Sequence, residues 1–227
     1  MERFKVALIV PAFNEESTII NVVKNILPYG VPIVVNDHSN DSTSKVEKIF
    51  RRKIIYHYSN KKNGYEKSIQ IGFDIAYKKK FSHVITFDAD NQHNPKDLIK
   101  VIKFFKKNYY LVVGERKILS RFSEKLFSIL FKKFVGLKDP LSGLKGYNLK
   151  VFIKNKNIFD SFSLAGTELL IKSHINNYKI AKFSILTRKR TGNSRFGNIL
   201  IGNFKIYKAL ILSIVILAIN KFKINSN

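Results

Sequence analysis

Residues 83–93, His-Val-Ile-Thr-Phe-Asp-Ala-Asp-Asn-Gln-His, form the most informative stretch of the sequence: an apolar run that ends in two carboxylates. The run is short and β-branched, which is typical of a buried strand. If the strand continued, Asp88 and Asp90 would point to the same face, where two close carboxylates repel unless a cation separates them or one is protonated. The pattern favours a shared divalent cation, Mg²⁺ or Mn²⁺, with the amide oxygen of Gln92 as a further ligand. The plainer alternative is a strand that ends in a polar turn.

Apolar runs of the same kind recur on both sides of this stretch. Strands are predicted at residues 6–10, 32–35, 54–58, 84–87 and 111–114, and helices at residues 15–27, 42–51, 65–79 and 95–107. This repeated β-α-β order predicts an α/β fold with a mainly parallel sheet and helices on both faces. In such folds ligands bind beyond the carboxyl ends of the strands.

Composition limits the class of protein. With 227 residues and 45% apolar content, the chain can bury one substantial core. Cysteine is absent, which excludes a disulfide framework and a thiolate metal site. The first residues lead into a strand-like segment without the features of a secretory signal, so we expect a cytoplasmic protein.

The charge of the chain is strongly positive. Lys and Arg number 41 against 16 Asp and Glu, which gives a net charge of +25. A field of this sign attracts nucleic acid, anionic lipid or phosphorylated substrates. The lysines are scattered over predicted helix faces, and no nucleic-acid-binding motif stands out, so nucleic acid is not an expected partner.

Polar residues cluster where the first two predicted strands end, at residues 11–16 and 36–43. Glu15 has an ordinary explanation, because acidic residues favour a helix N-terminus. Asp37 is more informative, since a carboxylate at a strand end can hydrogen-bond a ribose or a base edge.

Taken in order, these motifs form a longer set. The set comprises residues 10–15, 36–43, 63–64, 88–93, 114–116, 139–143 and 190–195, together with Gly72 and Glu168. It resembles the family 2 glycosyltransferases, which have a GT-A Rossmann-like fold, and within them the dolichyl- and polyprenyl-phosphate sugar synthases. Two positions depart from the family pattern: Asn36 stands where an aspartate is usual, and Leu144 where an aromatic is usual.

The resemblance implies a role for each matching residue. It assigns the nucleoside to Pro11, Phe13, Glu15, Asp37 and Asp88, and the metal to Asp90 and Gln92. It assigns substrate phosphates to Arg116 and Arg121 and to a late loop with Arg190, Ser194 and Arg195, and the sugar and acceptor to Gln92, Ser142, Gly143 and Glu168. Glu168 stands where relatives that act on hydroxyls place a possible base; here its role stays open between base, sugar contact and structure.

The activity implied is metal-dependent, inverting transfer of a hexose from a nucleotide sugar, of the GDP-mannose or UDP-glucose type, to a polyprenyl phosphate. Asp88, Asp90, Arg116 and Arg121 would form the catalytic set. One alternative is a transferase of the same fold that acts on a saccharide hydroxyl. The other is a basic protein without catalysis that binds membrane or nucleic acid.

The C-terminal segment predicts contact with an anionic membrane surface. We expect a GT-A domain at residues 1–197 and a basic, apolar helix at residues 198–227. The uncharged run at residues 209–219 is shorter than the ~20 residues needed to span a bilayer, so it would lie in the interface, peripheral to the inner face of the cytoplasmic membrane. Residues 119–135 form a second amphipathic candidate, with Leu119, Phe122, Leu126, Leu130 and Phe134 on one stripe. Both patterns also fit ordinary core helices.

Overall fold

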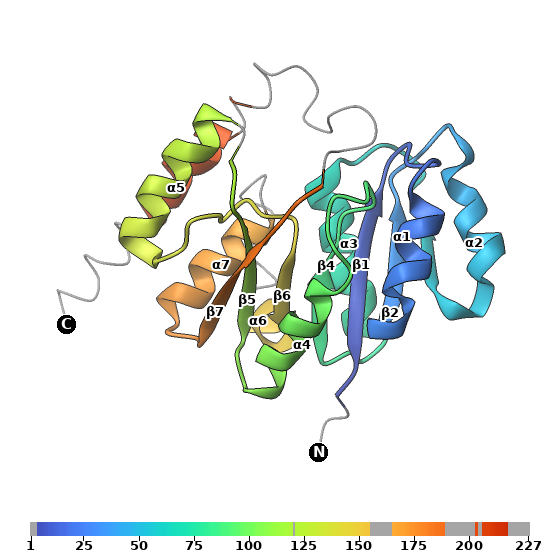
Figure 1. Cartoon of the computed structure of the whole chain (residues 1–227), viewed down its shortest axis with the longest axis horizontal. Coiled ribbons are helices and arrows are strands. Elements are labelled where there is room, and N and C mark those ends of the chain that lie inside the picture. The colour runs from blue at the N-terminus through green and yellow to red at the C-terminus, as the bar shows by residue number, and fades with distance from the viewer. Residues whose placement is uncertain (1–3, 120, 155–164, 189–202, 204–205, 218–227) are drawn as a thin grey trace.

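The computed structural model describes residues 4–119, 121–154, 165–188, 203 and 206–217 (Figure 1). Within them lies one seven-stranded sheet of order β3-β2-β1-β4-β6-β5-β7. The strands are β1 (Val6–Ala12), β2 (Val31–Asn36), β3 (Ile55–Tyr58), β4 (His83–Thr86), β5 (Leu111–Arg116), β6 (Lys145–Asn148) and β7 (Ile180–Ile185). Only β6 runs antiparallel to its neighbours, β4 and β5; the other pairs are parallel.

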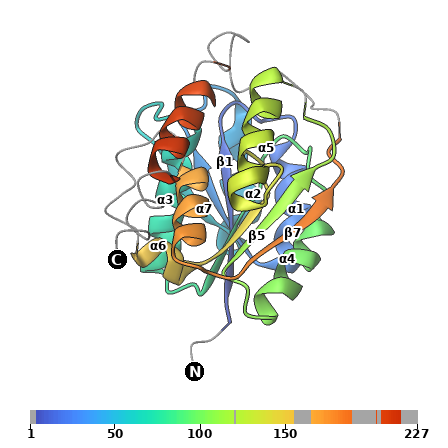
Figure 2. The same cartoon turned by 90° about the vertical axis from the view of Figure 1, so that its left-hand side faces the viewer.

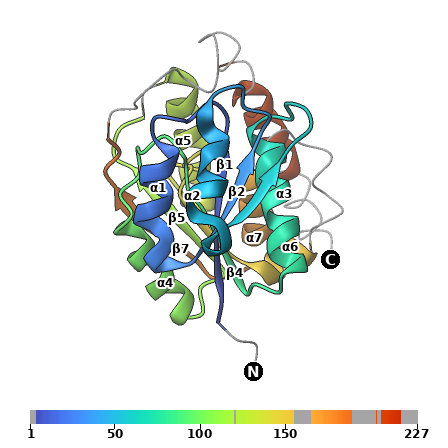
Figure 3. The ribbon, with the colours of Figure 1, turned by 90° about the vertical axis from the view of Figure 1, so that its right-hand side faces the viewer.

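Helices cover both faces of this sheet. They are α1 (Ile19–Ile26), α2 (Lys45–Phe50), α3 (Tyr65–Lys78), α4 (Asp97–Lys106), α5 (Phe122–Val135), α6 (Leu149–Lys154) and α7 (Ala165–Ile175), with 3₁₀ turns η1 (Leu27–Tyr29), η2 (Ser42–Ser44) and η3 (Arg51–Lys53), and a helix at 206–217. Helices α1, α2 and α4 share one core with the sheet, and α3, α5, α6, α7 and helix 206–217 share the other. Figure 3 shows α1 and α3 on opposite sides of the sheet.

The alternation of side chains along the strands explains the two cores. Leu8 belongs to the α1 side and Ile9 to the α3 side, and Val112 and Val113 divide in the same way. Because both faces are covered, successive strand residues are all apolar, which is why the strands appear as continuous apolar runs in the sequence.

The predicted α/β fold is confirmed, with differences at element ends. All five predicted strands are present within one or two residues of the expected bounds. Helix α1 begins four residues later than expected, because the carbonyl of Glu15 accepts the amides of Thr18 and Ile19 in a turn. The predicted helix at residues 42–51 is divided into η2 and α2, since the Asp41 side chain caps η2 through the amide of Thr43.

The strand directions determine where polar side chains meet. The carboxyl ends of β1, β2, β4 and β5 lie along one edge of the sheet, and β6, which runs the other way, begins at that edge. Residues that follow β1, β2 and β4 are thereby brought together with those that precede β6. This edge holds most of the residues named from the sequence.

Helix 206–217 packs against the body of the protein. Ile206, Ala209 and Leu210 are buried in the same core as Phe127 and Phe131 of α5. Figure 2 shows this helix and α5 on the same face of the molecule. Among the described residues, no helix has the length and apolarity needed to cross a membrane.

Candidate active site

Asp37, at the end of β2, holds a neighbouring loop. Its two carboxylate oxygens accept the amides of Asn63 and Gly64, each at 2.8 Å, just before α3 begins. Gly64 has φ of 93°, a value that L side chains rarely adopt, so glycine suits this turn. If Asp37 contributes to ligand binding, it would do so partly by fixing the conformation of residues 61–64, which would form one wall of the site.

The adjacent Asn36, which stands where the family usually has an aspartate, makes two hydrogen bonds in this structure. Its side chain is fully buried, donates from Nδ2 to the Tyr56 hydroxyl at 2.9 Å and accepts the amide of Ser39 at 2.9 Å. An amide can make both bonds because it has a donor and an acceptor. Asn36 thus orders the turn that follows β2.

The end of β1 contributes three of the residues predicted to bind a nucleoside. Pro11 is buried within β1, and Glu15 is buried with its amide bonded to Thr43 Oγ1 at 2.8 Å. Phe13 is only partly buried, and the Lys62 ammonium lies 3.8 Å from the centre of its ring. Phe13 is therefore the one of the three with an aromatic surface available to a flat ligand.

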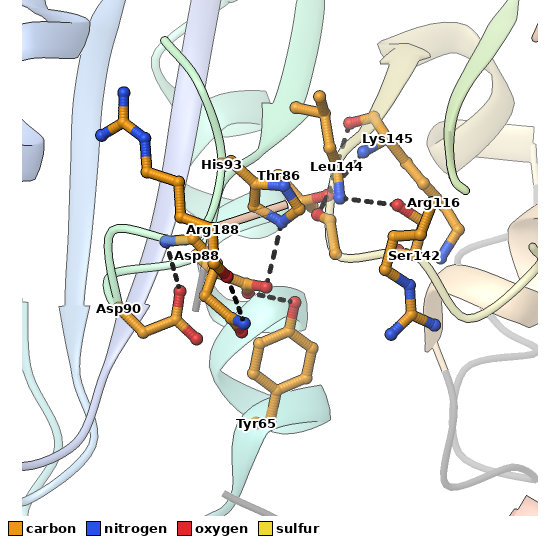
Figure 4. Close-up of polar contacts among 12 residues, drawn as sticks. Tyr65, Thr86, Asp88, Asp90, His93, Arg116, Ser142, Leu144, Lys145 and Arg188 are labelled. Atoms are coloured by element: carbon orange, nitrogen blue, oxygen red, sulfur yellow. Dashed lines mark hydrogen bonds and ion pairs between the residues drawn. The ribbon is translucent and has the colours of Figure 1, made fainter. Parts of the chain in front are cut away.

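Asp88 is held by two side chains (Figure 4). Oδ1 accepts the Tyr65 hydroxyl at 3.0 Å, and Oδ2 lies 3.2 Å from His93 Nε2. An ionised carboxylate can only accept, so a hydrogen bond here requires the His93 tautomer with its proton on Nε2. The Asp88 side chain keeps 16% exposure against 3% for His93, which leaves it within reach of a ligand.

Asp90 lies in a turn rather than on a strand, so the alternation expected for Asp88 and Asp90 is wrong. Strand β4 ends at Thr86, and Asn91 adopts a positive φ of 61°. Asp90 Oδ1 accepts the amide of Gln92 at 3.1 Å. The two carboxylates therefore make different contacts: Asp90 accepts a backbone amide of the turn, and Asp88 contacts the side chains of Tyr65 and His93.

These residues suit a metal that is shared with a substrate. The described residues contain no group of three or more His, Cys, Asp or Glu able to hold an ion alone. Mg²⁺ is often bound by one or two carboxylates together with substrate phosphates, and Asp90 with the Gln92 amide oxygen fits that pattern. Water or the phosphates of a substrate would complete the coordination of such an ion.

A second chain segment lies beside this turn. The amide of Arg188 donates to the Gln92 carbonyl at 2.9 Å, and Gln92 Nε2 donates to the Arg188 carbonyl at 3.2 Å. Arg188, which follows β7, is thus fixed next to Asp90 (Figure 4). The predicted phosphate contacts Arg190, Ser194 and Arg195 lie outside the described residues.

Arg116 forms ion pairs with two carboxylates inside the protein. Its guanidinium donates to both oxygens of Asp139, at 2.7 and 2.9 Å, and to Glu124 Oε1 at 3.3 Å. Burial alone would lower the pKa of Arg116, but the hydrogen bonds and charges of Asp139 and Glu124 outweigh it and raise that pKa above its ordinary value. Arg116 therefore joins β5, α5 and the loop at residues 139–143, while Arg121 stands at the N-cap of α5.

The loop at residues 139–143 is fastened against β4. Thr86 Oγ1 donates to the Gly143 carbonyl at 2.7 Å, and the buried Ser142 Oγ accepts the amide of Leu144 at 3.2 Å. A Cβ atom at Gly143 would lie 2.1 Å from Asp88 Oδ2. Only glycine lets this loop approach Asp88 so closely.

Lys145 is a buried cation behind the same loop. Its side chain donates from Nζ to the Ser142 carbonyl at 2.6 Å, and the residue is only 5% exposed. Burial lowers the pKa of Lys145 to about 8, against the opposing charges of Asp139, Glu66 and Asp88. This lysine therefore changes charge closer to neutral pH than an exposed lysine does.

Titration of Lys145 gives a testable dependence of stability on pH. Because its pKa falls from the usual 10.5 to about 8 on folding, the unfolded chain binds more protons between these values. The cost of burying the charge is fully present below about pH 8 and is lost as the pH rises. We expect the urea midpoint of the wild type, relative to Lys145→Met, to rise across this window.

The control for this prediction is Lys48→Met, which removes an exposed lysine on α2. That variant should follow the wild-type pH dependence. A constant difference between the wild type and Lys145→Met from pH 7 upward would contradict the prediction. Burial also raises the pKa of Tyr147 above its ordinary value. Because Tyr147 is present in the wild type and in both variants, its titration does not affect the comparison.

Glu168 lies on the first turn of α7, next to this loop. It is 6% exposed, and the adjacent Thr167 Oγ1 is 3.5 Å from the Pro140 carbonyl. The structure thus places Glu168 near the loop that contains Ser142 and Gly143. Asp88, Asp90 and Gln92 lie together on the opposite side of that loop.

For several residues of the site, little in the sequence indicated that they would lie there. Tyr65 and Thr86 are ordinary helix and strand residues, and only the fold brings them to Asp88 and Gly143. Lys145 had one usable signal, because a charged residue in a short strand between buried neighbours is uncommon. His93 was recognisable from its place beside the Asp88 motif.

The sequence of the chain is similar to one protein family and to several known proteins. The model of glycosyl transferase family 2 matches residues 7–125, more than half of the chain. A Methanocaldococcus jannaschii protein of unassigned function is 31% identical over 176 residues, which cover 69% of this chain and 76% of that protein. The UDP-N-acetylglucosamine–dolichyl-phosphate N-acetylglucosaminyltransferase of Methanococcus voltae is 34% identical over 135 residues, which cover 48% of this chain and about half, 51%, of the relative.

Solved structures agree on the fold. Glucosyl-3-phosphoglycerate synthase from Mycobacterium tuberculosis, in complex with phosphoglyceric acid, superposes with a TM-score of 0.71 at 16% identity, over 92% of this chain and 80% of that one. Its complex with Mn²⁺, UDP-glucose and phosphoglyceric acid gives 0.70 at 16% identity, over 92% and 79%. At this identity the likeness establishes the arrangement of strands and helices and nothing more specific.

Proposed function

Because this chain belongs to glycosyltransferase family 2, we propose that it transfers a hexose from a nucleotide sugar to a polyprenyl phosphate with the help of a divalent metal. The Methanococcus voltae relative carries a dolichyl-phosphate acceptor in its name, which supports a lipid phosphate here. The nucleotide sugar would lie along the ends of β1, β2 and β4. The acceptor would enter beside the loop at residues 139–143.

One observation carries the choice of a phosphate acceptor: the carboxylates beside that loop, Glu115, Glu124, Asp139 and Glu168, are buried, whereas exposed cations lie near it. Arg116 is balanced by Asp139 and Glu124, but Lys145 lies behind the loop. Further cations stand at its rim, namely Lys117, Arg121 and Lys138. A phosphate monoester would be attracted to the exposed cations, whereas a neutral sugar hydroxyl would gain nothing from them.

The donor side would supply charge and position. Asp90 and the Gln92 amide oxygen would hold the metal, which when bound neutralises the diphosphate as it leaves. Phe13 would lie against the base, and Asp37 would keep the wall at residues 61–64 in place. Asp88, oriented by Tyr65 and His93, would face the nucleoside and the sugar.

The reaction would need no general base. A phosphate monoester is already an anion near neutral pH, so its oxygen can attack the anomeric carbon while the bond to the nucleoside diphosphate breaks. Arg121 would guide the acceptor phosphate, and Arg116 would keep the loop in position through Asp139. A single displacement of this kind inverts the anomeric centre.

The test is direct. Purified protein is incubated with Mg²⁺ or Mn²⁺, a polyprenyl phosphate and a panel that includes UDP-glucose, UDP-N-acetylglucosamine and GDP-mannose, and lipid-linked sugar is measured. We expect product with one donor and an inverted anomeric configuration. Transfer to a saccharide, with none to lipid phosphate across the panel, would refute the proposal.

Two substitutions would separate the donor and acceptor sides. Asp37→Ala removes both bonds to residues 63–64, so nucleotide affinity measured by calorimetry without lipid should fall about tenfold or more. Arg121→Ala should leave that affinity nearly unchanged and raise the KM for lipid phosphate. Equal effects of both substitutions on nucleotide affinity would contradict this division.

A hydroxyl acceptor is the second candidate, and one observation favours it. The buried Glu168 lies on α7 beside the loop, where a carboxylate can serve as a base. If Glu168 is that base, Glu168→Gln should abolish transfer to saccharides. Under the lipid phosphate proposal the same variant keeps measurable transfer.

A further inference from the structure

Helix α5 and helix 206–217 lie on the same side of the molecule, and each exposes large apolar side chains. On α5 these are Phe122 at 73%, Ile129 at 66% and Phe134 at 43% exposure, and on the other helix Ile211 at 62% and Val215 at 47%. We call these five residues the two-helix face; Figure 2 shows the two helices side by side. Such a concentration of exposed apolar side chains marks an interaction surface.

The structure changes which residues of α5 point outward. The predicted stripe included Leu126 and Leu130, but both are partly buried against the core. Phe127 and Phe131 are fully buried. The outward row therefore runs through Ile129, which the stripe did not include, rather than through the leucines.

The charge of this face is of one sign. Lys125, Lys132 and Lys133 on α5 and Lys208 on helix 206–217 are exposed. In the described parts of these two helices the single acidic residue is Glu124, which is buried and paired with Arg116. Apolar side chains between lysines, without exposed acids, complement an anionic lipid surface.

The face is continuous with the site. The first turn of α5 is joined to the loop at residues 139–143 through Glu124, Arg116 and Asp139. Ile118 at 82% and Leu186 at 68% exposure follow β5 and β7, whose ends pair in parallel. Exposed apolar residues therefore extend from the two helices to the rim where an acceptor would enter.

We infer that the two-helix face rests on an anionic membrane surface, with the loop at residues 139–143 turned toward the headgroups. This inference rests on the proposed function, because a polyprenyl phosphate presents its phosphate at that level. The described part of this helix, residues 206–217, is about 18 Å long against the roughly 30 Å of a hydrocarbon core, and its packing in the core shared with α5 would hold it along the surface. Lysine stems would extend to the headgroups while the apolar side chains enter the interface.

The test compares vesicle binding of the full chain and of two variants. Vesicles of phosphatidylcholine with a minority of phosphatidylglycerol are sedimented with wild type, with Ile129→Ser/Ile211→Ser, and with the control Ile49→Ser. Ile49 is 54% exposed on α2, away from this face. We expect the double variant to lose about tenfold in partition coefficient and the control to match the wild type.

Further measurements make the result decisive. Wild-type binding should weaken at high salt and on vesicles of phosphatidylcholine alone. Circular dichroism should show that the double variant is folded, and its activity on a short water-soluble prenyl phosphate should equal that of the wild type. Unchanged vesicle binding by the double variant would overturn the inference. So would a wild-type dimer in solution that the double variant converts to monomer, because the face would then cover a second copy of the chain.

The two proposals fail in different ways. If vesicle binding depends on Ile129 and Ile211 but no donor yields lipid-linked sugar, the docking surface stands and the proposed acceptor is wrong. If sugar is transferred to lipid phosphate while vesicle binding ignores both residues, the function stands and the docking surface is wrong.

Discussion

Asp90→Ala is expected to lower glycosyl transfer about a thousandfold or more, because the charge stabilisation that a metal gives a leaving group is worth several kcal/mol. Asp90 is 2% exposed, and its Oδ1 accepts the Gln92 amide, so the substitution affects the turn but no part of either core. The protein should remain folded by circular dichroism. Initial rates with a saturating nucleotide sugar and either Mg²⁺ or Mn²⁺ measure the effect.

Chelation of the wild type should reproduce the loss, and added metal should restore activity to the wild type only. Glu47→Ala serves as the matched control, because Glu47 is an exposed carboxylate on α2. It should retain wild-type rates. Full activity of Asp90→Ala in the presence of a chelator would remove the metal from the mechanism.

Gly143→Ala is expected to cost both activity and stability. The added Cβ would lie 2.1 Å from Asp88 Oδ2 and 2.8 Å from Asp88 Cγ, so either the loop or the carboxylate has to move. Overpacking of this kind costs about 1–3 kcal/mol of folding stability. Activity should fall about a hundredfold, because small misplacements in an active site have effects of that size.

A double substitution identifies the cause. Asp88→Ala removes the atoms that the new Cβ would meet, so adding Gly143→Ala in that background should cost little further stability. The comparison is a thermodynamic cycle of four urea titrations. If Gly143→Ala destabilises the Asp88→Ala protein as much as the wild type, the clash lies elsewhere.

The grouping of Asp37 and Asp88, on the proposed donor side, could be predicted because both residues follow strands. Continuous apolar runs located β1, β2 and β4, and parallel strands bring their carboxyl ends to one edge, so Asp37 and Asp88 had to lie near each other. The local geometry was not foreseeable in the same way. Asn91 enters the left-handed region directly after Asp90, and the run of apolar residues before it gives no sign that the strand stops at Thr86.

The acceptor side was less predictable for a physical reason. A sequence shows that Arg116 is cationic but not which carboxylates surround it, and its partners Glu124 and Asp139 come from α5 and a distant loop. Strand β6 consists of Lys-Gly-Tyr-Asn, without a β-branched residue, so its propensity is weak. Its conformation comes from pairing with β4 and β5 rather than from its own sequence.

The reversed strand β6 also bears on the order in which the protein folds. Strand β4 makes two long-range pairings, with β1 across 77 residues (Val6 to His83) and with β6 across 59 (Thr86 to Lys145), whereas β1, β2 and β3 pair through short crossovers. Contacts between distant residues form late, because closing a long loop costs entropy before the contact is made. During synthesis the strands that carry Asp37 and Asp88 leave the ribosome well before β6. Because β1, β2 and β4 are all synthesised before β6, the half that we propose binds the nucleotide can form first, and the loop at residues 139–143 would be set against Asp88 only when β6 enters the sheet.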